Sequence, residues 1–162
     1  DLAQVWSPQS TALKDRGNVV LCDASETKLS MPAVWVAHPN FVADPKNREA
    51  IIGWLKANLE AVDWILADRK RTFDLYKKYD KYRGFNFSDK LLEGEVDLVM
   101  STYMGLKEQI KMLAKGADGK KPIVKSFEEI AQFFIRQGRM KSVPDYAKVI
   151  DASYLKAIAG GK

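Results

Sequence analysis

Three short apolar runs precede residue 38, after which the chain changes to a helical period. The runs are Leu2–Trp6, Val19–Cys22 and Ala33–Ala37. The first is strand-like, and the continuous apolar run Val19–Cys22 and the run Ala33–Ala37 are typical of strands buried on both faces of a sheet. Three such strands are too few for a complete sheet and would leave exposed edges. We therefore expect the rest of the sheet to come from residues that precede this chain in a longer protein.

The remainder of the chain is predicted to be helical. From Lys46 onward, apolar residues recur every three or four positions, which indicates a long helix near Asn47–Ala67. The aromatic residues Phe73, Tyr76, Tyr79 and Tyr82 of the following segment form a stripe that is expected to pack in the core. Further helices are expected at Gln9–Lys14, at Phe73–Tyr82 before Gly84, after a cap at Ser88, over Leu106–Leu113, after a capping box of Ser126 and Glu129, and after Asp151 or Ser153.

Composition excludes several classes of function. Hydrophobic residues make up 46% of the chain, yet no run approaches the length of a membrane helix. The single cysteine, Cys22, lies in an apolar run and is expected to be buried and inert. The single histidine, His38, argues against a multi-histidine metal site and is expected to be structural. The net charge of +5 is spread over runs that acidic residues interrupt, so no nucleic-acid partner is expected.

The segment Trp6-Ser7-Pro8-Gln9-Ser10 leads from the first apolar run into a helix start. A helix N-terminus presents free backbone N–H groups and a partial positive charge, which suit a small anion. Trp6 is a candidate aromatic wall, and Ser7, Gln9 and Ser10 are candidate hydrogen-bonding residues. A core role for Trp6 and a helix-capping role for Ser7 remain equally open.

Four segments resemble the C-terminal half of the periplasmic substrate-binding proteins of bacterial ABC importers. The similar branch includes binders of nitrate, sulfonates, taurine and the pyrimidine precursor of thiamine. The segments are DLAQVWSPQSTAL, NVVLCDASETKLSMPAVWVAHPNFVADP, REAIIGWLKANLEAVDWILAD and SFEEIAQFFIRQGRMKSVPDYAKVIDASYLKAI. Their order and spacing carry the resemblance, which covers nearly all of the chain. Residues 107–122 fit the pattern least well.

The resemblance implies an α/β fold of the two-lobe periplasmic binding protein type, with a helix-rich C-terminal portion. Residues 1–24 would end the second lobe, residues 25–32 would form the crossover between lobes, and residues 33–162 would complete the first lobe. The crossover would place Glu26 and Thr27 near the ligand cleft, and Lys28 beside them. The missing N-terminal portion of the protein would supply the facing wall.

The function implied by the resemblance is capture of a small polar or anionic solute in the periplasm, or at the extracellular face of a lipid-anchored protein. The partners would be the solute and a membrane permease. No cofactor, metal or enzymatic activity is expected. One alternative is a helical module that binds protein or nucleic acid through Tyr76–Arg83. A less favoured alternative is an enzyme of thiamine-pyrimidine metabolism on the same fold.

Overall fold

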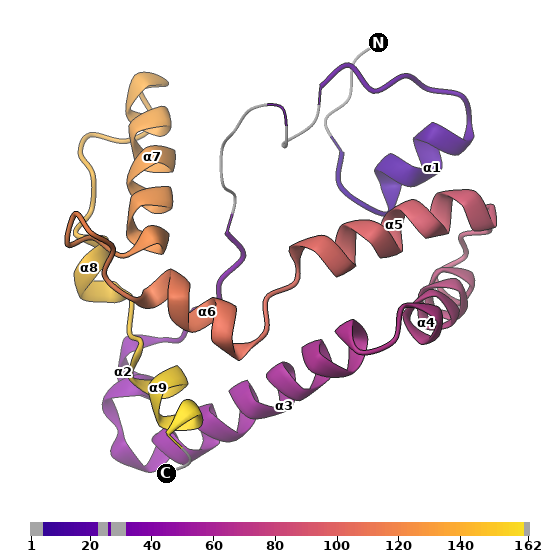
Figure 1. Cartoon of the computed structure of the whole chain (residues 1–162). Helices are drawn as coiled ribbons and strands as arrows, with labels where there is room; N and C mark the ends of the chain where they lie inside the picture. Colours follow the sequence, from indigo (N-terminus) through magenta and orange to yellow (C-terminus); the bar gives the residue numbers. More distant parts are fainter. Residues whose placement is uncertain (1–4, 23–25, 27–31, 161–162) are drawn as a thin grey trace. The chain divides into compact units, whose positions relative to one another are not determined.

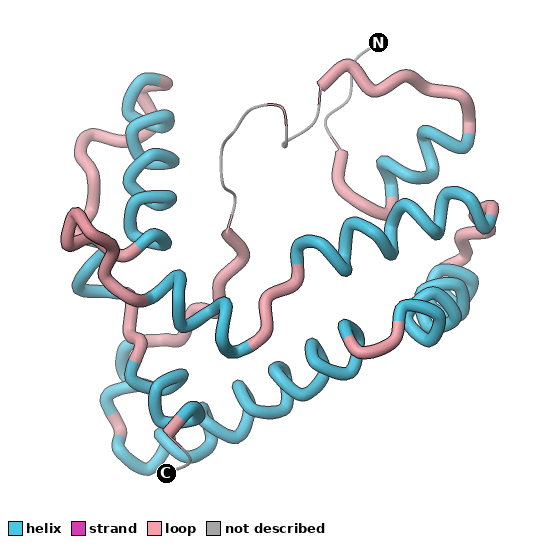
Figure 2. Tube along the Cα trace, viewed as in Figure 1, coloured by secondary structure: helices cyan, strands magenta, loops and turns pink. Residues whose placement is uncertain are grey.

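The chain forms helices joined by loops in a computed structural model that describes residues 5–22, 26 and 32–160. No strand occurs in these ranges (Figures 1 and 2). The helices are α1 (Gln9–Asp15), α2 (Pro39–Ala43), the 3-10 helix η1 (Pro45–Asn47), α3 (Arg48–Leu66), α4 (Arg69–Tyr82), α5 (Asp89–Thr102), α6 (Leu106–Leu113), α7 (Pro122–Arg136), α8 (Tyr146–Val149) and α9 (Ser153–Ala159). None of the described helices is long and apolar enough to cross a membrane.

Two compact units make up the structure. The first combines Asp1–Cys22 with Glu60–Tyr103, and the second combines Asp23–Leu59 with Met104–Lys162. Helix α3 begins in the second unit and ends in the first. The predicted division at residues 1–24, 25–32 and 33–162 concerns the lobes of a larger protein and not units within this chain. It stays a prediction.

In the first unit, α5 packs against α4 and α1 (Figure 1). Leu92, Val96 and Val99 recur at helical spacing along α5 and are buried. They form an apolar stripe of the kind that an amphipathic helix turns toward a core. Burial of this stripe is the main apolar contribution to the stability of the first unit.

Helix α4 has local signals at both ends. Asp68 precedes it, and its carboxylate accepts a hydrogen bond from the backbone N–H of Arg71 at 3.0 Å. The buried hydroxyl of Thr72 donates to the carbonyl of Ile65 at 2.7 Å, which joins the end of α3 to the start of α4. Gly84 follows α4 with a φ of 83°, a left-handed conformation that favours glycine and ends the helix.

The second unit packs α7 against α6 and α8, and α6 against α9. Pro122 begins α7, where its missing N–H leaves no helical hydrogen bond unmade. The predicted capping box is therefore wrong, because Ser126 lies inside the helix with its hydroxyl 3.4 Å from the Pro122 carbonyl. Phe127 of α7 stacks on Tyr146 of α8 with ring centroids 5.2 Å apart.

The expected α/β fold is wrong for the described structure. Val19–Cys22 and the described part of Leu2–Trp6, as well as Ala33–Ala37, are loops. The side chains of Val19–Cys22 and Ala33–Ala37 are exposed, and Val36 is accessible over 90% of its surface. An apolar sequence becomes a strand only when another backbone pairs with it, and the described residues supply no such partner. Cys22 was expected to be buried and is exposed.

The helical predictions agree better with the structure. The segments expected at Gln9–Lys14, Asn47–Ala67 and Leu106–Leu113 correspond to α1, α3 and α6. His38 is structural as expected, but at the start of a helix and not at the end of a strand: its Nδ1 accepts a hydrogen bond from the backbone N–H of Asn40 at 3.2 Å and caps α2. The short helix α8 lies within residues 143–150.

Candidate polar-ligand site

Two hydroxyl groups of the N-terminal segment converge on one carboxylate in the first unit. Ser7, in the turn before α1, donates to Oε2 of Glu95, and Thr11 of α1 donates to Oε1 of the same side chain. Glu95 projects from α5, which packs against α1. Both oxygens of the carboxylate are thereby bound by hydroxyl groups from a segment more than 80 residues away in sequence.

Three further groups interact electrostatically with Glu95 or with one another. Asp80 of α4 is buried, and this burial, together with the negative charge of Glu95, raises the pKa of its carboxyl group. The pKa of Tyr76 is raised, first by burial and then by a side-chain hydrogen bond with Tyr103 and by the negative charges of Glu95 and Asp80. We call Ser7, Thr11, Tyr76, Asp80, Glu95 and Tyr103 the Glu95 cluster.

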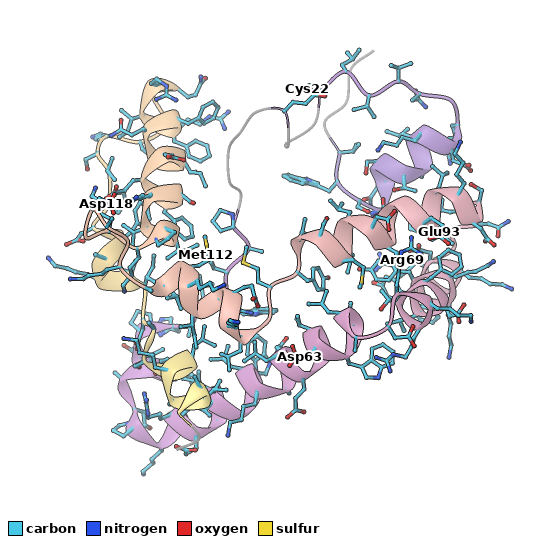
Figure 3. The ribbon with its side chains drawn as sticks, viewed as in Figure 1. Cys22, Asp63, Arg69, Glu93, Met112 and Asp118 are labelled. Carbon is cyan, nitrogen blue, oxygen red and sulfur yellow. The ribbon has the colours of Figure 1, made fainter. Side chains whose placement is uncertain are left out.

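Ion pairs outside the Glu95 cluster hold α4 and α5 together. Arg69 of α4 pairs with Glu93 of α5, and its Nη2 also lies 2.7 Å from Asp97 Oδ1. Figure 3 shows Arg69 beside Glu93 where the two helices lie next to one another. Lys77 pairs with Asp89 at 2.6 Å. These pairs are exposed and individually weak, but they link the same two helices that carry Asp80 and Glu95.

The Glu95 cluster is rich in hydrogen-bond acceptors. In the described part of the chain, no lysine, arginine or histidine forms an ion pair with Glu95 or Asp80. Thr11 is buried, but the exposed Ser7 hydroxyl keeps lone pairs that can accept a hydrogen bond from a solute. The chemistry therefore suits a solute with N–H donors, and above all a protonated amine, better than a simple anion.

The predicted site residues have different environments. Ser7 joins the Glu95 cluster and does not cap α1, which has no side-chain cap. Trp6 precedes it, is 64% exposed and is not a core residue. Gln9 is exposed and Ser10 is half-buried in α1. The backbone N–H of Ser10 was expected to face a ligand and instead donates to the Trp6 carbonyl at 2.9 Å.

The predicted ligand-binding role of the crossover residues stays a prediction. Glu26 is exposed and belongs to the second unit, and Thr27 lies outside the described residues. Among the predicted residues that the structure describes in the first unit, Ser7 joins the Glu95 cluster, and Trp6 is adjacent to it in the chain. The expected anion site at the start of α1 is not supported, because α1 has only 7 residues and its first turn faces a carboxylate.

Sequence reasoning missed Thr11, Asp80 and Glu95. A signal for Glu95 existed, because it lies three residues after Leu92 and four before Val99 and therefore shares the buried face of α5. Asp80 similarly lies four residues after Tyr76 on the inner face of α4. An acidic residue on an apolar helical stripe is a candidate for a buried polar interaction.

The second unit contains two hollows with different chemistry. One has a volume of about 590 Å³ and is lined by charged residues that neutralise each other, since Lys120 pairs with Glu128 at 2.8 Å and Lys125 with Asp118 at 2.5 Å. The ion pair with Lys125 lowers the pKa of Asp118. A smaller hollow of about 260 Å³ lies between α6 and α9. Across the ranges described, no group of three histidine, cysteine or acidic side chains could hold a metal ion.

No protein-family model, curated protein or solved structure matches this chain.

Proposed function

We propose that this chain is part of the solute-binding component of a bacterial ABC importer and that it holds a small polar solute at the Glu95 cluster. The four similar segments, in their order, support the importer assignment. The α/β fold expected from the same resemblance is not part of this proposal. The protein would act in the periplasm or at an extracellular membrane face and would deliver its solute to a permease.

The observation that carries the proposal is the convergence of Ser7 and Thr11 on Glu95. The hydroxyl groups come from the segment that the resemblance assigned to ligand binding, and the adjacent Trp6 is exposed. Aromatic side chains and a few convergent polar groups are both common in small-ligand sites. Among the expected solutes, the Glu95 carboxylate favours compounds with an amino group, such as taurine or an aminopyrimidine, over nitrate and alkanesulfonates.

Titration calorimetry with the whole chain tests this proposal. Taurine and an aminopyrimidine should release or absorb heat on binding, whereas nitrate and ethanesulfonate should bind more weakly. The variant Glu95→Gln should lower the affinity for the amine-bearing solute about tenfold, because it removes a charge-assisted hydrogen bond. The matched control is Glu60→Gln, which neutralises an exposed glutamate of the same unit.

Two outcomes would contradict the proposal. An absence of heat with all four solutes would remove the solute classes named. An equal loss of affinity in Glu60→Gln would show that binding responds to overall charge and not to the site. The alternative of a helical module that binds protein or nucleic acid through Tyr76–Arg83 stays a prediction, and salt-sensitive nucleic-acid binding is the measurement that favours it.

A further inference from the structure

One face of α4 carries aromatic and basic side chains that point away from the core of the first unit. Leu75 lies four residues after Arg71, Lys78 and Tyr79 lie three and four residues after Leu75, and Tyr82 lies four and three residues after these two, which places all five on one side of the helix. Tyr79 is 51% exposed and Tyr82 is 85% exposed. We call these five residues, with the neighbouring Lys81 and Arg83, the α4 outer face.

This exposure corrects an expectation from the sequence. The tyrosines of α4 were expected to pack in the core, and binding of protein or nucleic acid through Tyr76–Arg83 was only the alternative. The inner side of the helix is instead formed by the buried Thr72 and Asp80 and the half-buried Tyr76. Tyr79 and Tyr82 therefore lie outside the core and are available to a partner.

Three cations of the α4 outer face have no ion-pair partner among the described residues, whereas three other cations of α4 do. Lys70 pairs with Asp74, Lys77 with Asp89, and Arg69 with two acids of α5. Within the described ranges, by contrast, no carboxylate forms an ion pair with Lys78, Lys81 or Arg83. This surface is therefore a local excess of positive charge in a chain whose net charge is +5.

Two arginines lie against aromatic rings at this surface. The Arg71 guanidinium lies 3.9 Å from the centroid of a Trp64 ring, and it also donates to the Trp64 carbonyl. The Arg83 guanidinium lies 5.8 Å from the Tyr79 ring centroid and donates to the Tyr79 hydroxyl at 3.0 Å. Trp64 and Leu75 are themselves partly exposed, so an apolar strip runs beside the charges.

From these contacts we infer that the α4 outer face docks on a membrane surface that contains anionic lipids. Tyrosine and tryptophan side chains join an apolar ring to a polar tip and are favoured at the level of lipid headgroups. Leu75 can enter the boundary with the acyl chains, and the unpaired cations attract anionic headgroups. Single-stranded nucleic acid would also use tyrosines and cations, but it would gain nothing from an exposed leucine.

This inference does not rest on the proposed solute function. It uses Tyr79, Tyr82, Lys78, Lys81 and Arg83, none of which belongs to the Glu95 cluster. Loss of solute binding and loss of membrane docking can therefore be measured separately.

Sedimentation of the whole chain with lipid vesicles tests the inference. We expect the protein to sediment with phosphatidylcholine vesicles in which about a third of the lipid is phosphatidylglycerol, and not with phosphatidylcholine alone. Removing the three unpaired cations in the variant Lys78→Gln/Lys81→Gln/Arg83→Gln should lower the vesicle affinity about a hundredfold, at about fivefold for each cation. Tyr79→Ser/Tyr82→Ser should also weaken binding, because it removes the interfacial rings.

The matched control removes the same charge elsewhere on the first unit. Lys14, Arg16 and Lys90 are exposed cations of this unit, and the variant Lys14→Gln/Arg16→Gln/Lys90→Gln should bind vesicles nearly as well as the parent chain. Far-ultraviolet circular dichroism verifies that each variant is helical. If the first triple variant loses its helical signal, the single variant Lys78→Glu replaces it in the comparison.

Three results would overturn the inference. The first is a failure of the parent chain to bind phosphatidylglycerol vesicles. The second is an equal loss of binding in the control variant, which would indicate attraction by net charge alone. The third is tighter binding to an oligothymidylate than to vesicles, with loss of that binding in Tyr79→Ser/Tyr82→Ser, which would assign the surface to single-stranded nucleic acid.

Discussion

At the scale of single residues, Asp80 is the most unusual group of the first unit. Its side chain is buried, and the nearby Glu95 adds a negative charge to the same region. Both effects favour the protonated carboxyl group. The arrangement is unfavourable for stability, and a charged residue retained in such a place is a functional candidate on physical grounds.

The titration of Asp80 gives a prediction for stability and pH. Because the pKa is raised above its ordinary value of 3.8, the folded state binds a proton more readily than the unfolded state. Stability should therefore fall as the pH rises from the ordinary pKa through the folded pKa. Asp80→Asn should raise the free energy of unfolding by roughly 1 kcal/mol at neutral pH.

Urea unfolding at neutral pH and at about pH 4 measures this effect. The gain in free energy of unfolding of Asp80→Asn over the parent chain should shrink at the lower pH, where the Asp80 carboxyl group of the parent is more fully protonated. The control Asp63→Asn changes an exposed aspartate of the same unit and should have little effect at either pH. A variant less stable than the parent chain at neutral pH would refute the assignment.

At the scale of elements, α5 determines how the first unit is assembled. It contacts both α1 and α4, carries the apolar stripe and supplies Glu95. The sequence predicted a helix after Ser88, the segment that carries Leu92, Val96 and Val99. It did not predict that the same helix contacts α1, because that contact depends on packing between segments far apart in the chain.

A pair of leucine variants in α5 tests this role. Leu92 is 1% exposed and Leu98 is 53% exposed in the same helix. Leu92→Ala should lower the free energy of unfolding by about 3 kcal/mol, because it leaves a cavity in the core. Leu98→Ala should change it by less than about 0.5 kcal/mol. Chemical denaturation compares them, and similar losses in both variants would show that α5 is oriented differently.

At the scale of the whole molecule, exposed apolar loops remain to be explained. Val19, Leu21, Trp35 and Val36 lie in the runs that were expected to be buried strands, and all are largely exposed. Trp35 has one contact of note, an edge-on approach to Trp54 with ring centroids 4.4 Å apart. Apolar surface of this kind marks an interaction site or favours self-association.

We expect Val19→Ser/Val36→Ser to reduce self-association, because it removes exposed apolar surface from both runs. The free energy of unfolding should change by less than about 0.5 kcal/mol, since neither side chain is buried. Light scattering over a range of protein concentrations and urea unfolding measure the two effects. Val96→Ser is the contrasting variant, because Val96 is fully buried and its replacement should be strongly destabilising.

A loss of stability of more than about 2 kcal/mol in Val19→Ser/Val36→Ser would contradict the exposed position of these loops. Unchanged self-association would show that other surfaces, such as the α4 outer face, are responsible. The two measurements therefore separate packing within the chain from contact between molecules.

Most helices of this protein follow from its sequence because their hydrogen bonds join residues four positions apart, and the apolar period and caps act over the same distance. The period predicted α3 closely, and Gly84 marked the end of α4. The strands could not be established in this way, because a strand exists only where a second backbone pairs with it. The Glu95 cluster likewise required packing, since Ser7 and Glu95 are 88 residues apart. Their meeting depends on how α1 lies against α5, which no local pattern specifies.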